Sequence, residues 1–513
     1  MSTVATLFVA QSRLFPDRIA VEHDGKRITY AELRERAFRL AGSLRARGVE
    51  LGSRIAMLSE NRPEYLEAML AAASLGAVVA CQNWRLAPGE LRHCLDLVEP
   101  RLVVCSPRHA DKLAAAGRDG DAVFLGESYE ALLGEGVPLS EPEVFDPEHG
   151  LLILYTSGTT GLPKGALISH RAEIARNLVI RAEFGVSPED TFAAWSPLYH
   201  MGAADCALGT LMSGGKVVVV DGFDAARLAD VVATEQLGWL LVMPGMAAAF
   251  AEALERGSVR PKGVKLCGVM ADLVPPAEIA RITRLLGAPY ANTFGATETG
   301  CPPCSSNLIP VGVAPARLSK RQSPFCEVRL VDADDHAVSD GAPGELCMRG
   351  PTLFSGYFGV DAANREDFRG GWFHMGDVFV RNRDGSLDFV DRVKYLIKSG
   401  GENIYPAEIE RVLLQEPRVA EAAVVRRSDE KWGEVPVAFV ARRDDSLGAD
   451  DLYGRCRNEL AGYKQPKEIH FISLAEFPRS ASGKVQRHEL EKRLDDADSR
   501  SRPDPPEPER STT

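Results

Sequence analysis

Hydrophobic and polar positions along the chain follow two alternating patterns. Short apolar runs of strand length alternate with longer stretches in which apolar residues recur every three or four positions, as on one helix face. One of the helices opens with the capping-box pair Thr29 and Glu32. Because strands and helices alternate, we expect parallel sheets covered by helices. In the first 105 residues the patterns predict strands at 54–58, 77–80 and 102–105, and helices at 29–44, 63–75 and from Pro88 onward.

The alternation continues through the middle of the chain and then changes. Strands are predicted at 216–220 and 238–243, with a helix at 225–235 between them. From 325 to 349 the pattern consists of strands with polar turns, including a hairpin turn at 341–344. This stretch indicates a smaller β-rich subdomain within an α/β protein.

The last part of the chain predicts a separate, compact α+β unit. Its expected elements are a helix at 406–414, strands at 420–425 and 435–441, a helix at 452–460 and a strand at 468–472. The final residues are rich in Pro, Ser, Arg and Glu, a composition typical of disorder. We therefore expect an N-terminal domain over 1–391, a C-terminal domain over 392–497 and a disordered tail over 498–513.

A loop rich in glycine and hydroxyl residues follows the apolar run 151–155. It extends from Thr156 to Gly165 and contains three glycines, four hydroxyl residues and Lys164. Glycines allow several backbone N–H groups to point at one anion, and the hydroxyls and the lysine add further donors. The alternative is a flexible hairpin turn, but the Pro-Lys-Gly ending favours a phosphate-binding loop. It is not a Walker loop, since Lys164 is followed by Gly165.

Length and charge exclude several classes of protein. At 513 residues the chain is too long for one hydrophobic core and should contain at least two domains. The formal net charge of −12 argues against a nucleic-acid partner or an anionic membrane. Residues 1–11 resemble no signal peptide, and the longest apolar stretches, such as 71–81, are too short to span a bilayer.

The ten cysteines are scattered and do not form a disulfide framework. Cys301 and Cys304 have the spacing of a redox or metal pair, but they lie in a Pro-Pro turn with no second pair nearby. We interpret this spacing as coincidence. Scattered free thiols favour the reducing cytoplasm.

Seven motifs together resemble those of the adenylate-forming superfamily of acyl-CoA synthetases, peptide-synthetase adenylation domains and luciferases. They are the loop at 156–165, Pro197–His200, Thr293–Glu298, Gly344–Gly350, Gly371–Asp377, Asp391–Glu410 and Pro478–Lys484. The resemblance covers nearly the whole chain and is strongest to an acid–CoA ligase. It implies a large N-terminal domain that forms the adenylate and a small, mobile C-terminal lid.

The resemblance also implies a reaction in two halves. A carboxylate attacks the α-phosphate of ATP to give an acyl adenylate and pyrophosphate, and the thiol of coenzyme A then takes the acyl group and releases AMP. The first half brings two anions together and therefore depends on positioning and electrostatic stabilisation. The expected cofactors are ATP, Mg²⁺ and coenzyme A, and the protein would be a monomer or homodimer.

Each functional residue follows from the resemblance, motif by motif. Thr156 and Glu298 would hold Mg²⁺, although an isolated Glu in a turn is otherwise a solvated charge. The residues that would act in catalysis are Lys484, His200, Thr297 and Glu298. Those that would bind the nucleotide or coenzyme A are Thr156, Ser157, Gly158, Thr159, Thr160, Gly161, Lys164, Thr293, Phe294, Gly295, Asp377, Arg392, Lys398, Gly400, Gly401 and Glu402.

Two lysines have roles in the domain movement that the resemblance implies. Lys484 would bridge the substrate carboxylate and the α-phosphate, a role that suits a compact charge on a long stem. It must then leave so that the thiol can enter. Lys394 would be the hinge of that rotation. Outside this resemblance, Lys484 would be interpreted as a solvent-exposed loop lysine.

The candidate acid pocket is apolar. The segments 195–202, 242–246 and 268–271 contain no Lys or Arg, which disfavours a second carboxylate on the substrate. Val269 and Met270 are larger than the glycines often found there, so we expect an aryl, cyclic or short-to-medium-chain acid. The residues expected to bind the acid are His200, Met201, Gly268, Val269, Met270, Phe294 and Gly295.

Two alternatives remain at this point. Met201 stands where amino-acid-activating relatives have an Asp, and no carrier domain is recognisable, so an adenylation domain of a peptide synthetase is disfavoured. A ligase that loads the phosphopantetheine of a separate carrier protein remains the rival to coenzyme A. A non-catalytic binding or regulatory protein that kept the fold is the more distant rival, and intact Lys164, Glu298, Asp377 and Lys484 argue against it.

The loop 318–323 replaces a common Gly/Pro turn and has two interpretations. Lys320 or Arg321 could lie near the nucleotide or the acid, but we favour a solvated basic loop.

Overall fold

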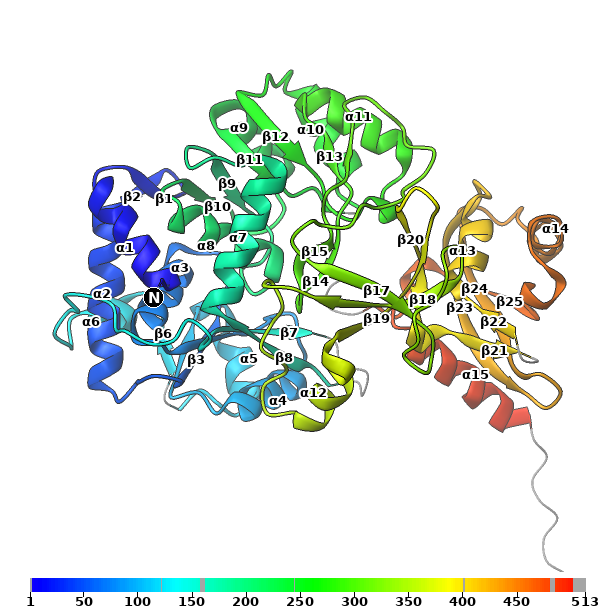
Figure 1. The fold of residues 1–513 in the computed structure, drawn as a ribbon, viewed down its shortest axis with the longest axis horizontal. Coiled ribbons are helices and arrows are strands. Elements are labelled where there is room, and N and C mark those ends of the chain that lie inside the picture. The colour runs from blue at the N-terminus through cyan, green and yellow to red at the C-terminus, as the bar shows by residue number, and fades with distance from the viewer. Residues whose placement is uncertain are drawn as a thin grey trace, which may run out of the picture. The chain divides into compact units, whose positions relative to one another are not determined.

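The computed structural model describes residues 2–120, 122–156, 162–243, 245–399, 402–479 and 485–501, and the side chains of all of these except 273, 403 and 495–501. The chain forms two compact units (Figure 1). The first comprises 1–329, 347–374 and 384–387, and the second comprises 330–346, 375–383 and 388–513. The functional boundary at residues 391 and 392 remains a prediction.

Two sheets form the framework of the first unit. The six-stranded sheet has the order β6 (Ala122–Phe124), β5 (Leu102–Cys105), β3 (Arg54–Leu58), β4 (Val78–Cys81), β7 (Gly150–Thr156), β8 (Lys164–Ser169). The eight-stranded sheet has the order β16 (Leu308–Ile309), β13 (Tyr290–Ala291), β12 (Gly263–Cys267), β11 (Gln236–Leu240), β9 (Thr191–Ala194), β10 (Lys216–Val219), β1 (Ile19–His23), β2 (Lys26–Thr29).

Both sheets are parallel in their interior, as the alternating pattern predicts. Antiparallel strands occur only at described edges, where β8 pairs with β7, β2 with β1 and β16 with β13. A hairpin of β14 (Phe294–Ala296) and β15 (Gly300–Cys304) follows β13. The predicted α/β fold class is confirmed.

Helices cover the faces of these sheets. The helix α3 contacts strands of both sheets and is buried all round from Tyr65 to Leu75, as expected for a helix between two sheets. At the top of Figure 1, α9, α10 and α11 pack together beside β12. The helices of the first unit are α1 (Val4–Leu14), α2 (Tyr30–Ala46), α3 (Pro63–Leu75), α4 (Pro88–Val98), α5 (Ala110–Ala115), α6 (Glu127–Leu133), α7 (His170–Phe184), α8 (Met201–Met212), α9 (Ala225–Thr234), α10 (Ala247–Arg256), α11 (Pro276–Leu286) and α12 (Asp361–Asp367).

The strand-rich stretch is confirmed, with one correction. Its sheet has the order β17 (Glu327–Val331), β18 (Pro343–Arg349), β19 (Phe373–Arg381), β20 (Leu387–Arg392). The predicted turn at 341–344 is too long, because Gly344 lies inside β18. A Cβ atom at position 344 would clash with Val331 and Val338. The turn itself ends before Pro343.

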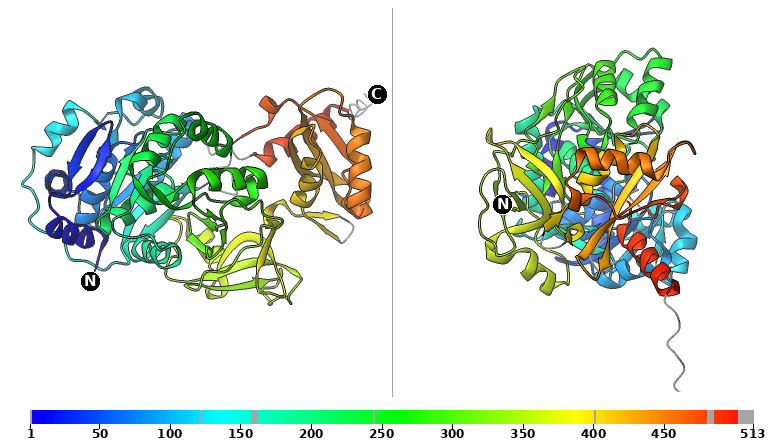
Figure 2. Two further views of the ribbon diagram at one scale, coloured as in Figure 1. Left: turned by 90° about the horizontal axis from the view of Figure 1, so that it is seen from above. Right: turned by 90° about the vertical axis from the view of Figure 1, so that its right-hand side faces the viewer.

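The C-terminal elements form the α+β unit that their spacing predicts. The sheet contains β22 (Glu402–Ile404), β21 (Ile397–Ser399), β24 (Gly433–Arg442) and β23 (Val419–Asp429), with β25 (Glu468–Phe471) paired to β24. Alternate residues of β23 and β24 face two different cores: α13 (Pro406–Leu414) and α14 (Ala449–Glu459) cover one face, and α15 (Arg487–Ser501) covers the other (Figure 2). The helix α15 includes four residues of the expected tail, and 502–513 lie outside the described residues.

Candidate functional site

Four segments of the first unit meet at the carboxyl edge of the eight-stranded sheet. They follow β9, β11, β12 and β13, which are mutually parallel, so their carboxyl ends lie on the same side. This edge is where open α/β sheets bind ligands. The segments are 195–200, 241–243 with 245–246, 268–272 and 292–295; they contain six of the seven residues predicted to bind the acid and three of those predicted to bind the nucleotide, Thr293, Phe294 and Gly295.

Tyr290 holds the apolar segments together. Its hydroxyl lies 3.1 Å from the carbonyl oxygens of both Val242 and Val269 and donates to them. Trp195 adds a second link, because its indole N–H donates to Leu241 O at 2.9 Å. Burial raises the pKa of Tyr290 well above its usual value, so the phenol remains a donor. The segments of the predicted apolar wall are therefore linked by hydrogen bonds.

Glycine is required at two predicted site positions. Gly268 has φ +81°, and a Cβ there would lie 2.1 Å from the ring of Tyr290. A Cβ at Gly295 would lie 2.0 Å from Gly300 O. Both glycines permit close packing within the protein. Val269 and Met270 are half-buried beside them, and Met270 has φ +47°, which is uncommon for a residue with a side chain.

The β14–β15 hairpin carries some of the residues predicted for the nucleotide, the metal and catalysis. Phe294 pairs with Cys304, and Thr297 and Glu298 lie in the turn between the strands. The turn is closed by Ala296 N, which donates to Thr299 Oγ1 at 2.9 Å. Glu298 is buried even though it lies in a turn, which argues against a merely solvated charge.

Tyr357 contacts both Glu298 and Lys164, the lysine of the predicted phosphate-binding loop. Its hydroxyl donates to Glu298 Oε1 at 2.9 Å, and Lys164 Nζ lies 4.6 Å from its ring centroid. The ammonium of Lys164 is also 3.8 Å from Asp367 Oδ2. Pairing of Tyr357 with Ala166 fixes the tyrosine beside β8. The sequence analysis missed Tyr357.

The loop itself is described only at its two ends. Thr156 and Lys164 are register partners of the antiparallel β7–β8 pair, so they face each other across the mouth of the loop. The predicted phosphate-binding residues between them, Ser157, Gly158, Thr159, Thr160 and Gly161, lie outside the described residues. The expected role of these five residues stays a prediction.

A buried arginine supports the turn that holds Thr297. Arg176 donates from Nη2 to Thr297 O at 2.9 Å and from Nη1 to Asp205 Oδ2 at 3.2 Å. Its side chain is 1 % exposed. Glu173 lies one helical turn before it, and burial together with the negative charge of Asp205 raises the pKa of Glu173 well above its usual value. A mid-helix arginine gives no sequence signal for this role.

Asn61 fixes the segment that leads to His200. Asn61 lies shortly after β3 of the six-stranded sheet. Its side-chain amide nitrogen donates to Ser196 O at 2.8 Å, and its Oδ1 accepts from Leu198 N at 2.8 Å. His200 is the N-cap of α8, and Met201 is its first residue. The ring of His200 is 4.6 Å from that of Tyr199. Asn61 is a second residue that the sequence analysis missed.

In the second unit, the two predicted ribose ligands contact each other. Arg392 Nε lies 3.1 Å from Asp377 Oδ1, and the Asp377 side chain is buried. The turn before Asp377 is held by Gly376 N, which donates to Glu345 Oε1 at 3.0 Å. The structure therefore brings these two predicted residues together.

Three more predicted residues of the second unit, Lys394, Lys398 and Glu402, are described and exposed. Lys394 is in a short 3₁₀ helix at Val393–Tyr395. Lys398 and Glu402 lie on the paired strands β21 and β22. Gly400, Gly401 and Lys484 lie outside the described residues, so their predicted roles are not tested.

Comparison with known proteins decides the family. The AMP-binding enzyme family matches residues 8–358, and the AMP-binding enzyme C-terminal domain matches residues 408–484. The chain belongs to the AMP-binding enzyme family. The predicted superfamily is thereby confirmed.

Proteins similar to this AMP-binding enzyme include CoA ligases. It is 35% identical over 497 residues to a feruloyl-CoA synthase of Amycolatopsis sp (95% of this chain, 98% of that protein). It is 36% identical over 499 residues to an indoleacetate–CoA ligase of Aromatoleum aromaticum (93% and 95%). It resembles the Bacillus subtilis o-succinylbenzoate CoA synthetase, solved with its acyl-adenylate intermediate, with a TM-score of 0.83 and 27% identity (94% and 97%). The predicted acid–thiol ligase class is confirmed.

The expected solvated loop around Lys320 is wrong. In this AMP-binding enzyme the Lys320 side chain is 0% exposed, and its ammonium lies 2.5 Å from Asp272 Oδ2 and 2.6 Å from Asn292 Oδ1. Paired partners offset the cost of burying the charge. Its neighbour Arg321 is exposed.

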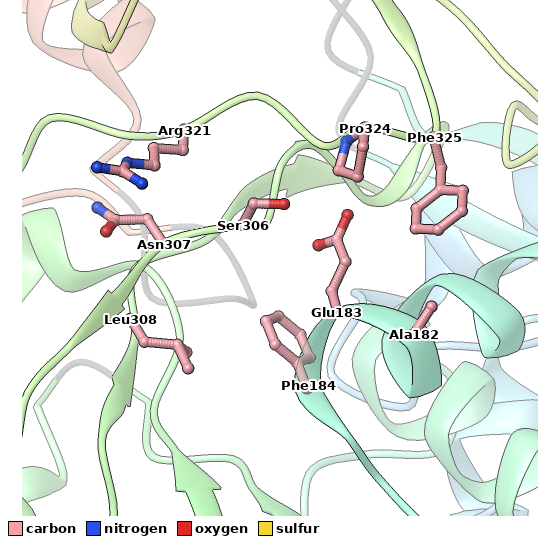
Figure 3. Close-up of a pocket in the computed structure, with 9 residues that line it drawn as sticks. All are labelled: Ala182, Glu183, Phe184, Ser306, Asn307, Leu308, Arg321, Pro324 and Phe325. Carbon is pink, nitrogen blue, oxygen red and sulfur yellow. The ribbon is translucent and has the colours of Figure 1, made fainter.

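The cavity of about 590 Å³ in Figure 3 is lined by the end of α7, by residues 306–308 and by residues that follow Lys320. Ser323 Oγ donates to Glu183 Oε1 at 2.5 Å beside it. None of the described site residues predicted from the sequence lines the cavity. Its lining residues are Ala182, Glu183, Phe184, Ser306, Asn307, Leu308, Arg321, Pro324 and Phe325.

All ten cysteines are free thiols, and the setting of Cys301 and Cys304 differs from the predicted turn. Cys301 and Cys304 lie in strand β15 around a Pro302–Pro303 pair rather than in a turn. Residues three apart in a strand point to opposite faces, and among the described residues neither thiol belongs to a cluster of metal ligands. No helix within the described ranges is both long and apolar enough to cross a membrane.

Proposed function

We propose that this AMP-binding enzyme activates an apolar aryl or cyclic carboxylic acid with ATP and transfers the acyl group to coenzyme A. The observation that carries the proposal is the arrangement around Tyr357, which brings the cation of Lys164 and the carboxylate of Glu298 to one place. A triphosphate needs a cation beside its terminal phosphates and an oxygen ligand for its metal. The apolar segments at the carboxyl edge would hold the acid.

Adenylation requires an in-line attack on phosphorus. A carboxylate oxygen forms a bond to the α-phosphorus of ATP, and the bond to the bridging oxygen of pyrophosphate breaks. Lys164 would bind the β- and γ-phosphates, and Thr297 and Lys484 would stabilise charge on the α-phosphate. His200 would orient the carboxylate or gate the thiol channel rather than act as a base.

Two described residues offer oxygen ligands that suit a magnesium ion. Glu298 offers a buried carboxylate that Tyr357 orients, and Thr156 offers a hydroxyl at the loop mouth. Oxygen ligands of this kind suit Mg²⁺. A related CoA synthetase from Bacillus subtilis, 26% identical over 94% of this chain, with a TM-score of 0.80, has been solved with ATP and magnesium. When bound, the ion neutralises phosphate charge.

Thioester formation would use the second unit. The thiolate of coenzyme A attacks the acyl carbonyl carbon, and the bond to the phosphate oxygen of AMP breaks. For the thiol to reach this carbon, Lys484 must leave, and a rotation about Lys394 would remove it. Asp377 and Arg392 would bind the ribose, while Lys398, Gly400, Gly401 and Glu402 would border the thiol channel.

The acid is assigned by pocket chemistry and by relatives. Ferulate and indoleacetate appear in the names of the CoA ligases that this chain resembles. Val269 and Met270 narrow the wall, so aryl or cyclic acids fit better than very long chains. Relatives that act on coenzyme A favour it over a carrier protein as the acceptor. The free thiols favour a cytoplasmic site of action, with the protein as monomer or homodimer.

A panel of acids tests this function. Purified protein with Mg²⁺, ATP and coenzyme A should convert ferulate, indoleacetate or a related aryl acid to its CoA thioester, detected by HPLC with AMP and pyrophosphate. Acylation of a carrier protein without any CoA adduct would favour the rival acceptor. No pyrophosphate with any acid of the panel would contradict the proposal.

A further inference from the structure

Lys320 is fixed at both ends. Its ammonium bonds to Asp272 Oδ2 and Asn292 Oδ1, and its side chain is fully buried. Its backbone forms a two-way bridge with Leu387: Lys320 N donates to Leu387 O at 2.8 Å, and Leu387 N donates to Lys320 O at 2.9 Å. Lysines are rarely buried, and a long side chain held at both ends has little conformational freedom.

The two partners of the ammonium belong to two different binding segments. Asp272 comes two residues after Met270, at the end of the apolar wall. Asn292 directly precedes Thr293, the first predicted nucleotide residue of its segment. One ammonium therefore bonds the acid wall and the nucleotide segment simultaneously.

Asn292 strengthens this link. Its amide nitrogen donates to Leu318 O at 3.1 Å and to Ser319 O at 3.2 Å, so the loop that carries Lys320 is bonded to the same asparagine twice more. Asn307 also donates to Ser319 O at 2.7 Å. The loop, the wall and the nucleotide segment thus form one hydrogen-bonded assembly.

We propose that Lys320 is a positioning residue that sets the spacing between the bound acid and the bound ATP. This inference rests on the proposed function of the two segments. Adenylation requires the carboxylate oxygen to face the α-phosphorus, and a misplacement of about 1 Å can lower such a rate by about a hundredfold. Lys320 fixes that spacing without touching either substrate.

Loss of this ammonium should loosen the link rather than unfold the protein. The Asp272 side chain is 31% exposed, so water can solvate its carboxylate once the lysine is gone. Lys320→Met retains much of the buried volume. Asp272→Asn retains an oxygen acceptor for the ammonium but removes the charge.

The test compares the two half-reactions in Lys320→Met, Asp272→Asn and the double variant. In Lys320→Met, pyrophosphate release should fall at least about tenfold, because the two substrates are no longer held at the reactive spacing. Thioester formation from supplied acyl adenylate should stay within about twofold of wild type, since there the acid and nucleotide are already joined. The stoichiometry and affinity of ATP binding, measured by titration, should also be kept.

The double variant and a control define the mechanism. The double variant should be no slower than Lys320→Met, because both changes break one interaction. Arg317→Met alters an exposed basic residue of the same stretch and should leave both half-reactions unchanged. Wild-type pyrophosphate release by Lys320→Met would overturn the inference, as would a loss of rate that only matches a loss of ATP-binding stoichiometry.

A second variant keeps the test valid if Lys320→Met does not fold. Asp272→Ala removes the acceptor as well as the charge, and its full adenylation rate would overturn the inference. Two outcomes separate this inference from the proposed function. A wild-type chain that releases no pyrophosphate with any acid would overturn the proposed function and the inference with it. An active wild type with an equally active Lys320→Met would overturn the inference alone.

Discussion

The hydroxyl of Tyr357 donates a 2.9 Å hydrogen bond to Oε1 of Glu298. The ring of the same tyrosine lies 4.6 Å from the ammonium of Lys164. One side chain thus orients the carboxylate proposed for the metal and contacts the cation proposed for the phosphates. Because a hydrogen bond to a charged group is stronger than one between neutral groups, the hydroxyl should matter for the position of Glu298.

Tyr357→Phe removes this hydroxyl and keeps the ring. We expect kcat/KM for adenylation to fall about tenfold, which corresponds to the loss of about 1.5 kcal/mol from a charge-assisted bond. The Mg²⁺ concentration for half-maximal rate should rise, because the carboxylate is less well oriented. A Mg²⁺ titration of pyrophosphate release measures both effects.

A second tyrosine provides the control. The Tyr453 hydroxyl donates to a backbone carbonyl, Lys467 O, at 3.4 Å in the C-terminal unit. Tyr453→Phe should therefore leave the Mg²⁺ titration unchanged. The same titration curve for Tyr357→Phe and wild type would show that the bond to Glu298 plays no part in metal use.

Glu173 should make stability depend on pH. Burial and the neighbouring charge of Asp205 raise its pKa well above the ordinary 4.5, so the folded protein keeps a proton that the unfolded chain releases. Its contribution is fully present below pH 4.5 and is lost as pH rises toward the folded-state pKa, by up to about 1.4 kcal/mol per pH unit. Glu173→Gln, a neutral replacement of the same shape, should flatten the fall of Tm above pH 6.

Thermal unfolding at pH 5 to 9 measures this slope. Over this range, the difference in Tm between Glu173→Gln and wild type should shift in favour of the variant as pH rises, by about 2 °C per pH unit. Glu252 is exposed on α10, and Glu252→Gln should leave the wild-type slope unchanged. Parallel curves for wild type and Glu173→Gln would contradict a proton held at this site.

Local sequence pattern was sufficient to predict the strands and helices of the sheets, but not the side-chain contacts between distant segments. Apolar runs and helical spacing are properties of neighbouring residues, so α3 and α13 have the predicted bounds and β3 begins and ends as expected. Lys320 shows where such reasoning fails. Its partners Asp272 and Asn292 are 48 and 28 positions away, and no local pattern indicates a buried ion pair.

In the candidate site too, residues within a short motif could be named from the sequence, whereas residues that act through distant partners could not. Thr297 and Glu298 could be named as candidates because a short motif contains them, and their roles stay predictions. Tyr357 could not, since it is 59 positions from Glu298 and becomes its partner only when residues 356–358 pair with β8. Arg176 and Asn61 also act through distant backbone carbonyls, which leave no mark on the surrounding sequence.

Met270→Gly should widen the acid specificity without destabilising the fold. Met270 has φ +47°, a left-handed conformation that costs a residue with a side chain about 1–2 kcal/mol. Glycine relieves this strain, which offsets its greater freedom in the unfolded chain. Removing the side chain also opens the wall beside Val269, so kcat/KM for a longer or bulkier acid should rise about tenfold relative to a small one.

Ser258→Gly separates the two effects. Ser258 is exposed and has φ +46°, so glycine relieves a similar backbone strain away from the pocket. Both variants should keep Tm near that of wild type, but only Met270→Gly should change the ranking of acids in the HPLC panel. An unchanged ranking for Met270→Gly would mean that its side chain does not limit the pocket.

Lys484→Ala and Lys394→Pro should fail in opposite half-reactions. Loss of the Lys484 charge removes stabilisation of the α-phosphate, so adenylation should fall by about 10²–10³, as for other preorganised donors, while supplied acyl adenylate is still converted to thioester. Proline at 394 fixes φ and should block the rotation that admits the thiol, so adenylation continues and thioester formation stops.

Lys492→Ala, on the exposed side of α15, should affect neither step. Equal loss of both half-reactions in Lys484→Ala would refute its separate role, and normal thioester formation by Lys394→Pro would show that the second half-reaction needs no rotation about this residue.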